Sequence, residues 1–366
     1  MDNWYPINNV SELDSPALVV YPDRVRENLS ILRQFVPDVT RLRPHVKTNK
    51  CAEVCQLMMD AGITKFKCAT IAEAEMLGTL GAKEVLLAYQ PVGPKVHRLI
   101  AVIQKFPGTH FSCLIDHAAA ARAISELALT AGVVIPVFID INVGMNRTGI
   151  AIDHVFSLAE QCSALKGIRI KGLHAYDGHL RDSDLTLRTA KCDAGFAPVA
   201  EVRIQLETKW GRSLTVIAGG TPTFPIHAQR QKVECSPGTF IFWDKGYQQL
   251  LPEQPFVFAA LVITRVISKP APHIITVDLG HKAIASENPL SNRVYFLNAP
   301  DVEPIGHSEE HLVLKTHQDF NLGDVLYGVP YHICPTVALH ETLAVVENHQ
   351  LTGTWNVISR KRKITV

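Results

Sequence analysis

Residues 41–50 concentrate side chains that could do covalent or acid–base chemistry. On a strand, residues two apart share a face, so Arg41, Arg43, His45 and Lys47 should line one side. Barrel active sites lie at the carboxyl ends of strands, and at such an end the neighbouring positive charge would lower the pKa of Lys47. A fraction of its amine would then be nucleophilic. The alternative is a solvated edge strand with ordinary surface lysines.

Two turns that follow late strands could hold an anion, because glycine lets backbone N–H groups turn toward a bound phosphate and threonine adds a hydroxyl. These turns are Gly219-Gly220-Thr221 and Gly238-Thr239. Two such turns fit a single phosphate group better than a nucleotide. The alternative is a pair of plain turns.

Two more predicted strand ends are polar. Residues 172–179 place His174, Tyr176 and His179 at one, and a glycine-rich loop containing Arg147 follows the other. A single histidine is more often an ordinary core or surface residue, but several polar strand ends on one rim indicate a site.

A possible metal site lies near the carboxyl end of the sequence. His332 and Cys334 are two apart, so on an extended segment they would face the same way. Imidazole and thiolate suit Zn²⁺ or a similar transition metal. Two ligands are fewer than the three usual at a catalytic zinc, so water, substrate or a distant residue would complete the shell. The pair alone is a weak signal.

The elements that would position these residues alternate along the chain. Short β-branched runs and helical-period segments follow one another up to about residue 240. About eight such units match the size of a (β/α)₈ barrel, and no GxGxxG follows the first strand. The predicted strands are 17–21, 41–48, 65–69, 84–89, 110–115, 135–142, 168–175 and 214–218. After about residue 250, short strands separated by turns predict a second, mostly β domain.

Composition excludes several classes of protein. The 366 residues are 47% hydrophobic, which allows a sizeable core and excludes global disorder. A net charge of +1 gives no electrostatic footprint for nucleic acid or an anionic membrane. No apolar run approaches a membrane span, and no signal peptide is visible, so we expect a cytoplasmic protein with mostly reduced cysteines.

Taken together, these segments resemble the D-threonine aldolase and D-serine dehydratase family, pyridoxal-phosphate enzymes of the alanine-racemase-like fold. The shared motifs occur in family order over nearly the whole chain. They lie at 43–50, 144–149, 172–179, 219–223, 236–240, 277–283, 307–311 and 332–336.

The resemblance implies an α/β fold. A pyridoxal-phosphate-binding (β/α)₈ TIM barrel, similar to the alanine racemase N-terminal domain, would cover residues 16–250. A mostly β domain would cover 251–366, with the N-terminal segment 1–22 lending it a strand, and it would carry the metal site. Family members are commonly dimers, so a homodimer is expected.

The resemblance also implies roles for the site residues. Lys47 would be the Schiff-base lysine, with His45 beside it, and His174 would lie against the cofactor ring. Arg147 and Tyr176 would lie near the polar edge of that ring. The phosphate would be held by Gly219, Gly220, Thr221, Gly238 and Thr239. His332 and Cys334 would bind Zn²⁺ or Mn²⁺, brought to the barrel mouth from the second domain or from a partner subunit.

Two departures from the family pattern leave the reaction open. Asn49 stands where histidine is frequent, and His332-x-Cys334 replaces the His-x-Asp of aldolase-type members and looks more like the dehydratase branch. The expected function is a metal-assisted lyase of D-β-hydroxy-amino acids, acting by retro-aldol cleavage or by elimination. Lys47 would be the base in elimination, and His174, His179 or a metal-bound water would be the base in aldol cleavage.

Two alternatives use the same scaffold. An amino-acid racemase needs a second base, and no clear tyrosine-bearing racemase motif is present in the second domain. A non-catalytic protein that only carries the cofactor is disfavoured by the additional β domain with its His-x-Cys pair.

Overall fold

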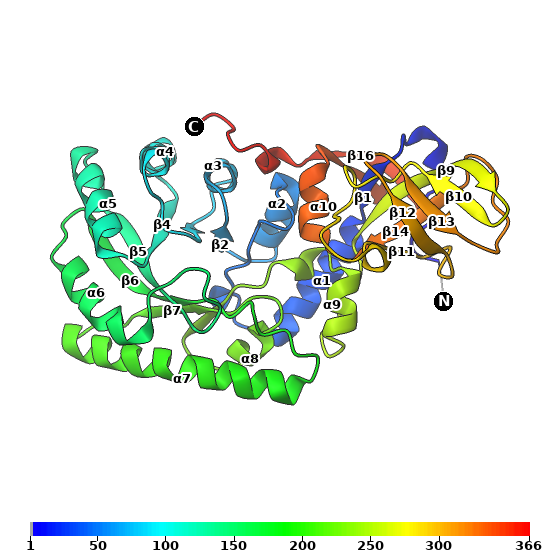
Figure 1. Cartoon of the computed structure of the whole chain (residues 1–366). Coiled ribbons are helices and arrows are strands. Elements are labelled where there is room, and N and C mark those ends of the chain that lie inside the picture. The colour runs from blue at the N-terminus through cyan, green and yellow to red at the C-terminus, as the bar shows by residue number, and fades with distance from the viewer. Residues whose placement is uncertain (1–2) are drawn as a thin grey trace. The chain divides into compact units, whose positions relative to one another are not determined.

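The computed structural model describes residues 3–366 and divides into two compact units (Figure 1). The barrel unit contains Leu32–Lys47, Cys55–Gly238 and Lys361–Val366. The β unit contains Met1–Ile31, Thr48–Val54 and Thr239–Arg360; residues 1 and 2, the start of the N-terminal segment predicted above, lie outside the described residues.

The barrel unit is built on a parallel sheet of seven strands in chain order. Its strands are apolar runs bounded by turn residues, as expected for strands buried on both faces. They are β2 (Lys65–Cys68), β3 (Glu84–Leu87), β4 (His110–Ile115), β5 (Ile135–Ile141), β6 (Ile168–Ala175), β7 (Thr215–Ala218) and β8 (Val233–Cys235).

The predicted strand 41–48 is replaced by a short 3₁₀ helix, η2 (Val39–Arg41), and an extended segment that closes the barrel. The Arg43 N–H donates to the carbonyl of Cys235 on β8, and the Lys67 N–H on β2 donates to the carbonyl of Pro44. Proline has no N–H to donate, so the segment forms isolated bridges and not a continuous ladder. Six of the eight predicted strands correspond to β2–β7. The predicted strand 17–21 is β1 (Ala17–Val20), which belongs to the sheet of the β unit, 41–48 is not a strand, and the sequence does not predict β8.

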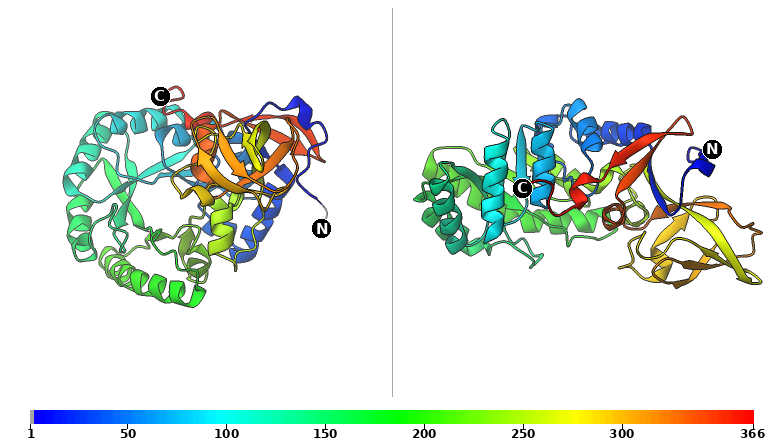
Figure 2. Two further views of the ribbon diagram at one scale, coloured as in Figure 1. Left: turned by 45° about the vertical axis from the view of Figure 1, so that its right-hand side comes forward. Right: turned by 90° about the horizontal axis from the view of Figure 1, so that it is seen from above.

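Helices cover the outside of these strands (Figure 2). Their ends follow local chemistry: the Thr70 hydroxyl caps α3, and Gly211, in a left-handed conformation with φ of 60°, ends α7. The helices are α3 (Ile71–Thr79), α4 (Pro94–Lys105), α5 (Ala118–Thr130), α6 (Val155–Ser163), α7 (Leu185–Trp210) and α8 (Phe224–Ala228). Residues of α1 (Pro22–Phe35) and α2 (Ala52–Asp60) are divided between the two units.

The barrel interior contains an apolar cluster and a charged network. The cluster consists of Leu86, Leu114, Phe138 and Ile217. In the network, the fully buried Arg43 donates to Glu234 at 2.7 Å and to Glu84 at 2.8 Å, and Lys65 pairs with Glu234 at 2.5 Å. The two buried charges of this network, Arg43 and Glu234, therefore each have a partner of opposite sign, as burial requires.

The β unit contains a nine-stranded sheet in the order β12-β13-β10-β9-β1-β15-β16, with β14 on β9 and β11 on β14. The first strand of the chain, β1, pairs antiparallel with β9 and parallel with β15. The strands are β1 (Ala17–Val20), β9 (Ala260–Ala271), β10 (Ile274–Val277), β11 (Val294–Phe296), β12 (Glu303–His307), β13 (Leu312–Lys315), β14 (Val325–Pro330), β15 (Thr342–Glu347) and β16 (Gln350–Asn356).

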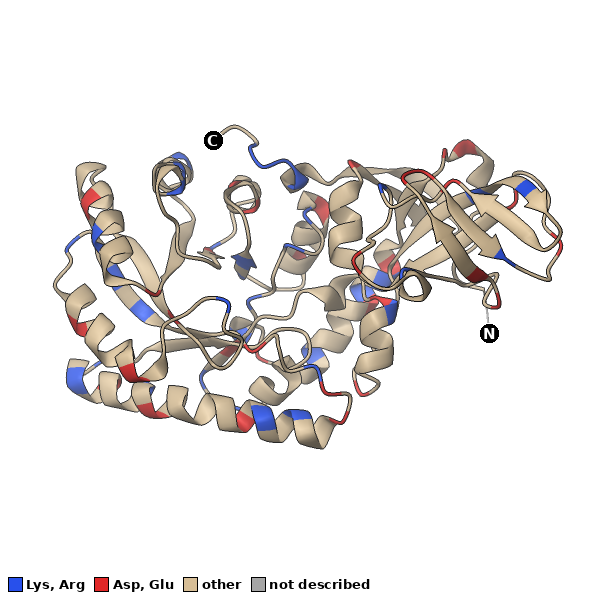
Figure 3. Cartoon of the chain, viewed as in Figure 1, with Lys and Arg blue, Asp and Glu red and all other residues tan. Residues whose placement is uncertain are grey.

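Short helices complete the chain, and the fold class is confirmed as an α/β barrel followed by a mostly β region. The remaining helices are α9 (Lys245–Leu250), α10 (Ile333–Leu339), η1 (Val10–Glu12), η3 (Ile152–His154), η4 (Thr239–Ile241), η5 (Leu290–Asn292) and η6 (Ile358–Arg360). None of the helices within residues 3–366 is long and apolar enough to cross a membrane. Charged residues of both signs are spread along α7 (Figure 3).

Candidate active site

A cavity of about 220 Å³ opens at the carboxyl ends of the barrel strands. Its walls come from the closing segment, from the ends of β2, β3 and β6, and from the loop after β5. The lining residues are His45, Lys47, Lys67, Ala69, Ala88, Tyr89, Arg147, Thr148, His174 and Tyr176. This is the end of a barrel at which active sites are found.

Lys47 lies in a turn over residues 46–49, directly after the extended part of the closing segment, and it lines this cavity. The Lys47 backbone N–H donates to His45 Nδ1 at 3.2 Å, so the two predicted residues are held together. Arg43 lies on the same side but is neutralised by glutamates, and Arg41 donates to backbone carbonyls near the end of α8. The four-residue row of cations thus divides into two structural arginines and two cavity residues.

His174, at the end of β6, forms a buried pair with Asp140 of β5. Its Nδ1 lies 2.6 Å from Asp140 Oδ1. Burial lowers the pKa of His174 and the charge of Lys67 lowers it further, while Asp140 opposes them; the net direction is down. The imidazole is therefore neutral near pH 7, with its proton on Nδ1 facing the carboxylate. Its Nε2 is buried and has no hydrogen-bond partner among the described residues.

Tyr176 contacts two basic side chains on the cavity wall. Its ring centroid is 5.2 Å from Lys67 Nζ and 4.9 Å from Arg147 Cζ. A Cβ atom on Gly220 would come within 2.9 Å of the Tyr176 ring, so a residue without a side chain is required there. The ring therefore links the cavity to the glycine turn.

Asp177 stabilises the turn after β7 through a hydrogen bond to Thr223. Gly219 has φ of +75°, a conformation that favours glycine. The Thr223 hydroxyl donates to Asp177 Oδ1 at 2.6 Å and accepts the Gly220 N–H at 3.3 Å. Thr221 Oγ1 accepts the Gly238 N–H at 3.3 Å, which joins the first predicted phosphate turn to the start of the second. Thr239, the last predicted phosphate ligand, begins η4 in the β unit.

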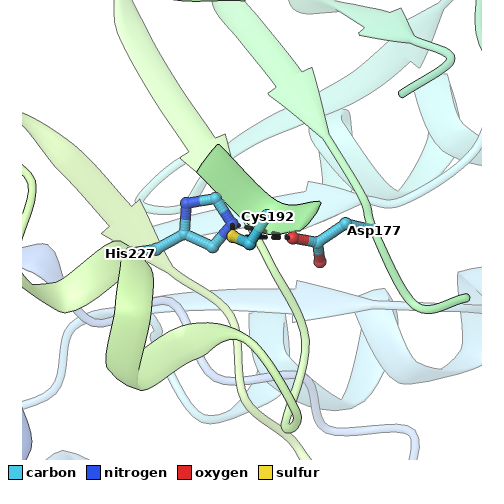
Figure 4. A group of neighbouring side chains, drawn as sticks. All are labelled: Asp177, Cys192 and His227. Carbon is cyan, nitrogen blue, oxygen red and sulfur yellow. Dashed lines mark hydrogen bonds and ion pairs between the residues drawn. The ribbon is translucent and has the colours of Figure 1, made fainter. Parts of the chain in front are cut away.

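Asp177 also belongs to a buried group with Cys192 and His227, whose ligand atoms lie within 4.8 Å of one another (Figure 4). The group could hold a metal by distance alone. However, the Arg230 guanidinium donates to His227 Nδ1 at 2.7 Å, so Nε2 carries the proton shared with Asp177. Burial raises the pKa of Cys192 to about 12. A metal would have to displace both protons, so we interpret the group as a hydrogen-bonded support for the turn.

In the β unit, His332 and Cys334 lie at the start of α10. His332 is the N-cap and Cys334 falls in the first helical turn, so the expectation of an extended segment is wrong. The Cys334 side chain nevertheless hydrogen-bonds to His332. Burial lowers the pKa of His332, but Cys334 and Glu287 outweigh it and raise the value to about 9. Cys334 is partly exposed, whereas the other seven cysteines are buried.

Two neighbours complete the surroundings of this pair. Glu287 hydrogen-bonds to His332 Nδ1, so a metal would bind Nε2, after displacing its proton. The Thr48 hydroxyl lies 3.1 Å from Cys334 Sγ. Nitrogen, sulfur and a carboxylate on the second ring nitrogen form a donor set that suits zinc.

The predicted residues thus fall into distinct places. His45, Lys47, Arg147, His174 and Tyr176 share the barrel cavity. His179 does not line it; it is exposed, and its Nε2 would lie 3.0 Å from a Cβ on Gly144.

Sequence reasoning missed Lys67, Asp140 and Glu287 as site residues. For Lys67 a signal existed: in Lys65-Phe66-Lys67-Cys68 two lysines alternate with apolar residues on a predicted strand, which points both lysines to one face. For Glu287, the residue types carried no signal.

Comparisons with known proteins show the family of the chain. The family model "Alanine racemase, N-terminal domain" matches residues 20–245, and "Putative serine dehydratase domain" matches residues 259–346. A D-threonine aldolase of Arthrobacter sp is 27% identical over 97% of this chain and 95% of its own.

Solved structures are similar over nearly the whole chain. D-threonine aldolase from Filomicrobium marinum superposes with a TM-score of 0.88 at 27% identity, covering 96% of each chain. D-threo-3-hydroxyaspartate dehydratase from Delftia sp. HT23 gives 0.80 at 26% identity, covering 94% of this chain and 97% of the other. The resemblance inferred from the motifs is confirmed.

Proposed function

The chain belongs to the family of the alanine racemase N-terminal domain, and from this premise we propose that it is a pyridoxal-phosphate- and divalent-metal-dependent lyase of D-β-hydroxy-amino acids. The main support is the barrel cavity, where the Lys47 amine shares a space with the unpaired Nε2 of His174. Threonine and 3-hydroxyaspartate, which appear in the names of the relatives, both carry a β-hydroxyl.

Several features of the barrel unit fit the cofactor. Lys47 supplies the amine for its aldehyde, and the neutral His174 imidazole offers a flat, uncharged face. The turn at Gly219 and Gly220 and the Thr221 hydroxyl suit its phosphate. When bound, pyridoxal phosphate supplies an electron sink for charge at the substrate Cα, and a divalent metal supplies Lewis acidity toward the β-hydroxyl.

The chain's own groups account for the proton transfers. Lys47 Nζ, once released from the aldehyde carbon, is the base for the Cα proton in elimination. In aldol cleavage the β-hydroxyl proton must leave, and His174 Nε2 is an unprotonated acceptor oriented by Asp140. His179, which is exposed and outside the cavity lining, is the weaker candidate.

The metal is assigned to His332 and Cys334. A thiolate and an imidazole favour Zn²⁺ over Mn²⁺, and Glu287 on His332 Nδ1 matches the usual support of a metal-bound histidine. The alternative group of Asp177, Cys192 and His227 is less suitable. Arg230 donates to His227 Nδ1, so the other ring nitrogen carries a proton that a metal would have to displace.

Elimination is the favoured reaction within the lyase class, because Cys334 replaces the aspartate that the aldolase pattern carries at this position. The test is product analysis of the purified protein with pyridoxal phosphate and Zn²⁺ or Mn²⁺, given D-threonine and D-serine separately. Pyruvate and ammonia from D-serine would establish a dehydratase, and glycine and acetaldehyde from D-threonine an aldolase. Appearance of the L-enantiomer alone would establish the racemase instead.

We also propose that the protein takes a small-molecule substrate, forms a homodimer and is located in the cytoplasm. Light scattering of the purified protein tests the dimer, because a monomeric mass would exclude it. Cell fractionation tests the location.

A further inference from the structure

Lys67 occupies a position in the barrel interior that should be apolar. It is on β2, is 3% exposed, and lies opposite Leu86 in the strand register. Leu86 belongs to the apolar cluster of the barrel interior. An ammonium group at this level is unfavourable unless something in the cavity stabilises it.

No counter-ion is present for this group among the described residues. Lys67 Nζ makes no hydrogen bond or ion pair there, and its one close polar contact is the face of the Tyr176 ring at 5.2 Å. The neighbouring carboxylates are engaged elsewhere: Asp140 with His174, and Asp177 with Thr223 and His227.

The surrounding charges further raise the free-energy cost of a cation at this position. Lys47 and Arg147 line the same cavity as Lys67, and none of the carboxylates within residues 3–366 does. Burial lowers the pKa of Lys67 to about 7, Lys47 and Arg147 lower it too, and Asp140 and Asp177 oppose them. The amine is therefore poised to take up a proton from solvent when an anion enters the cavity.

We propose, on the basis of the function proposed above, that Lys67 binds an anionic oxygen of the molecule held in the cavity. Two sources share this chemistry: the carboxylate of the amino-acid substrate and the phenolate oxygen of the cofactor. In either case Lys67 contributes a charge-assisted hydrogen bond from inside the barrel, while Lys47 serves as the covalent anchor.

The experiment compares the wild-type protein with Lys67→Gln and Lys67→Met. The control is Lys65→Gln. It removes a lysine from the same face of the same strand, but this lysine is already paired with Glu234. Spectral titrations give the dissociation constant of pyridoxal phosphate for each protein. Further titrations of each loaded protein give the constants for D-alanine and for D-alaninamide, which lacks the carboxylate. Thermal unfolding verifies that each variant is folded. If Lys67→Gln does not fold, the comparison is made with Lys67→Met.

A substrate contact predicts that loss of Lys67 weakens D-alanine binding by about 10- to 100-fold, leaving D-alaninamide and cofactor binding unchanged. A cofactor contact predicts a similar weakening of pyridoxal phosphate binding. The ratio of the dissociation constants for D-alanine and D-alaninamide would then be unchanged. If the Lys67 variants match the wild type and the control in all three constants, the inference is overturned. If the wild type itself binds no pyridoxal phosphate, the proposed function is refuted, and the inference about Lys67 falls with it.

Discussion

Replacing Lys67 by methionine should stabilise the cofactor-free protein at neutral pH, and the gain should shrink as pH rises. Methionine has a similar length and no charge, and it would lie beside Leu86 in an apolar layer. The substitution removes a buried cation for which the described residues provide no counter-ion. When replacing a site residue stabilises a protein, the original residue usually serves function at the expense of stability.

The magnitude follows from the difference in pKa between the folded and unfolded states. Folding lowers the pKa of Lys67 from its ordinary value of 10.5 to about 7, and at 1.36 kcal/mol per unit this is a penalty of about 5 kcal/mol. The pKa is depressed in the folded state, so below about pH 7 both states hold the proton and the full penalty applies. Between about pH 7 and 10.5 only the unfolded state holds it, so stability rises with pH. From about pH 7 to 9 the expected rise is about 2 kcal/mol.

The assay is urea unfolding of the cofactor-free wild type and of Lys67→Met at about pH 7, 8 and 9. The difference between the two proteins should fall by about 2 kcal/mol over this range. Other groups cancel in the difference to the extent that they titrate alike in both proteins. Those that face Lys67 are His45, Lys47, Asp140, Arg147, His174, Tyr176 and Asp177. A difference that does not change with pH would mean that folding does not lower the pKa of Lys67, because its charge is compensated, and this would refute the reasoning. A variant that is less stable than the wild type at every pH would refute it as well.

Three further predictions concern the other site residues. Lys47→Ala should abolish both the visible absorbance of bound cofactor and product formation; turnover that survives would remove Lys47 from its assigned role. Glu287→Gln should weaken Zn²⁺ binding by about 10- to 100-fold in calorimetry, because His332 loses the carboxylate that orients it; an unchanged affinity would contradict this. Gly220→Ala should raise the dissociation constant of pyridoxal phosphate, since the new Cβ would lie 2.9 Å from the Tyr176 ring, and an unchanged constant would show that the turn adapts.

Most barrel strands could be predicted from the sequence because each is a short apolar run bounded by turn residues. The predicted strand 135–142 corresponds to β5 (Ile135–Ile141), and 168–175 to β6 (Ile168–Ala175). The segment after Arg41 could not, because its alternation of charged and apolar residues is that of a strand while Pro44 prevents a full ladder. Periodicity reports which side chains face inward, but not whether the backbone ladder is complete.

The site could be predicted only in part, for a related reason. Strand-end positions follow from topology, so Lys47, His174 and Tyr176 were accessible to sequence reasoning. The placement of His332 and Cys334 was not, because the start of α10 contains a proline and β-branched residues that weaken a helical signal. Glu287 is 45 residues away along the chain from His332, and only the fold brings the two together.

Lys65 and Lys67 explain why residue type alone does not reveal function. Both lie on one strand, two residues apart, and alternation points both into the barrel. Lys65 has Glu234 at 2.5 Å, within a network that also neutralises Arg43, so its charge is accounted for inside the fold. Lys67 lies at the level of the cavity, where the described residues supply no such partner. A buried cation that its own chain leaves uncompensated persists at a cost to stability, and that cost is best explained by an anion that arrives with the cofactor or the substrate.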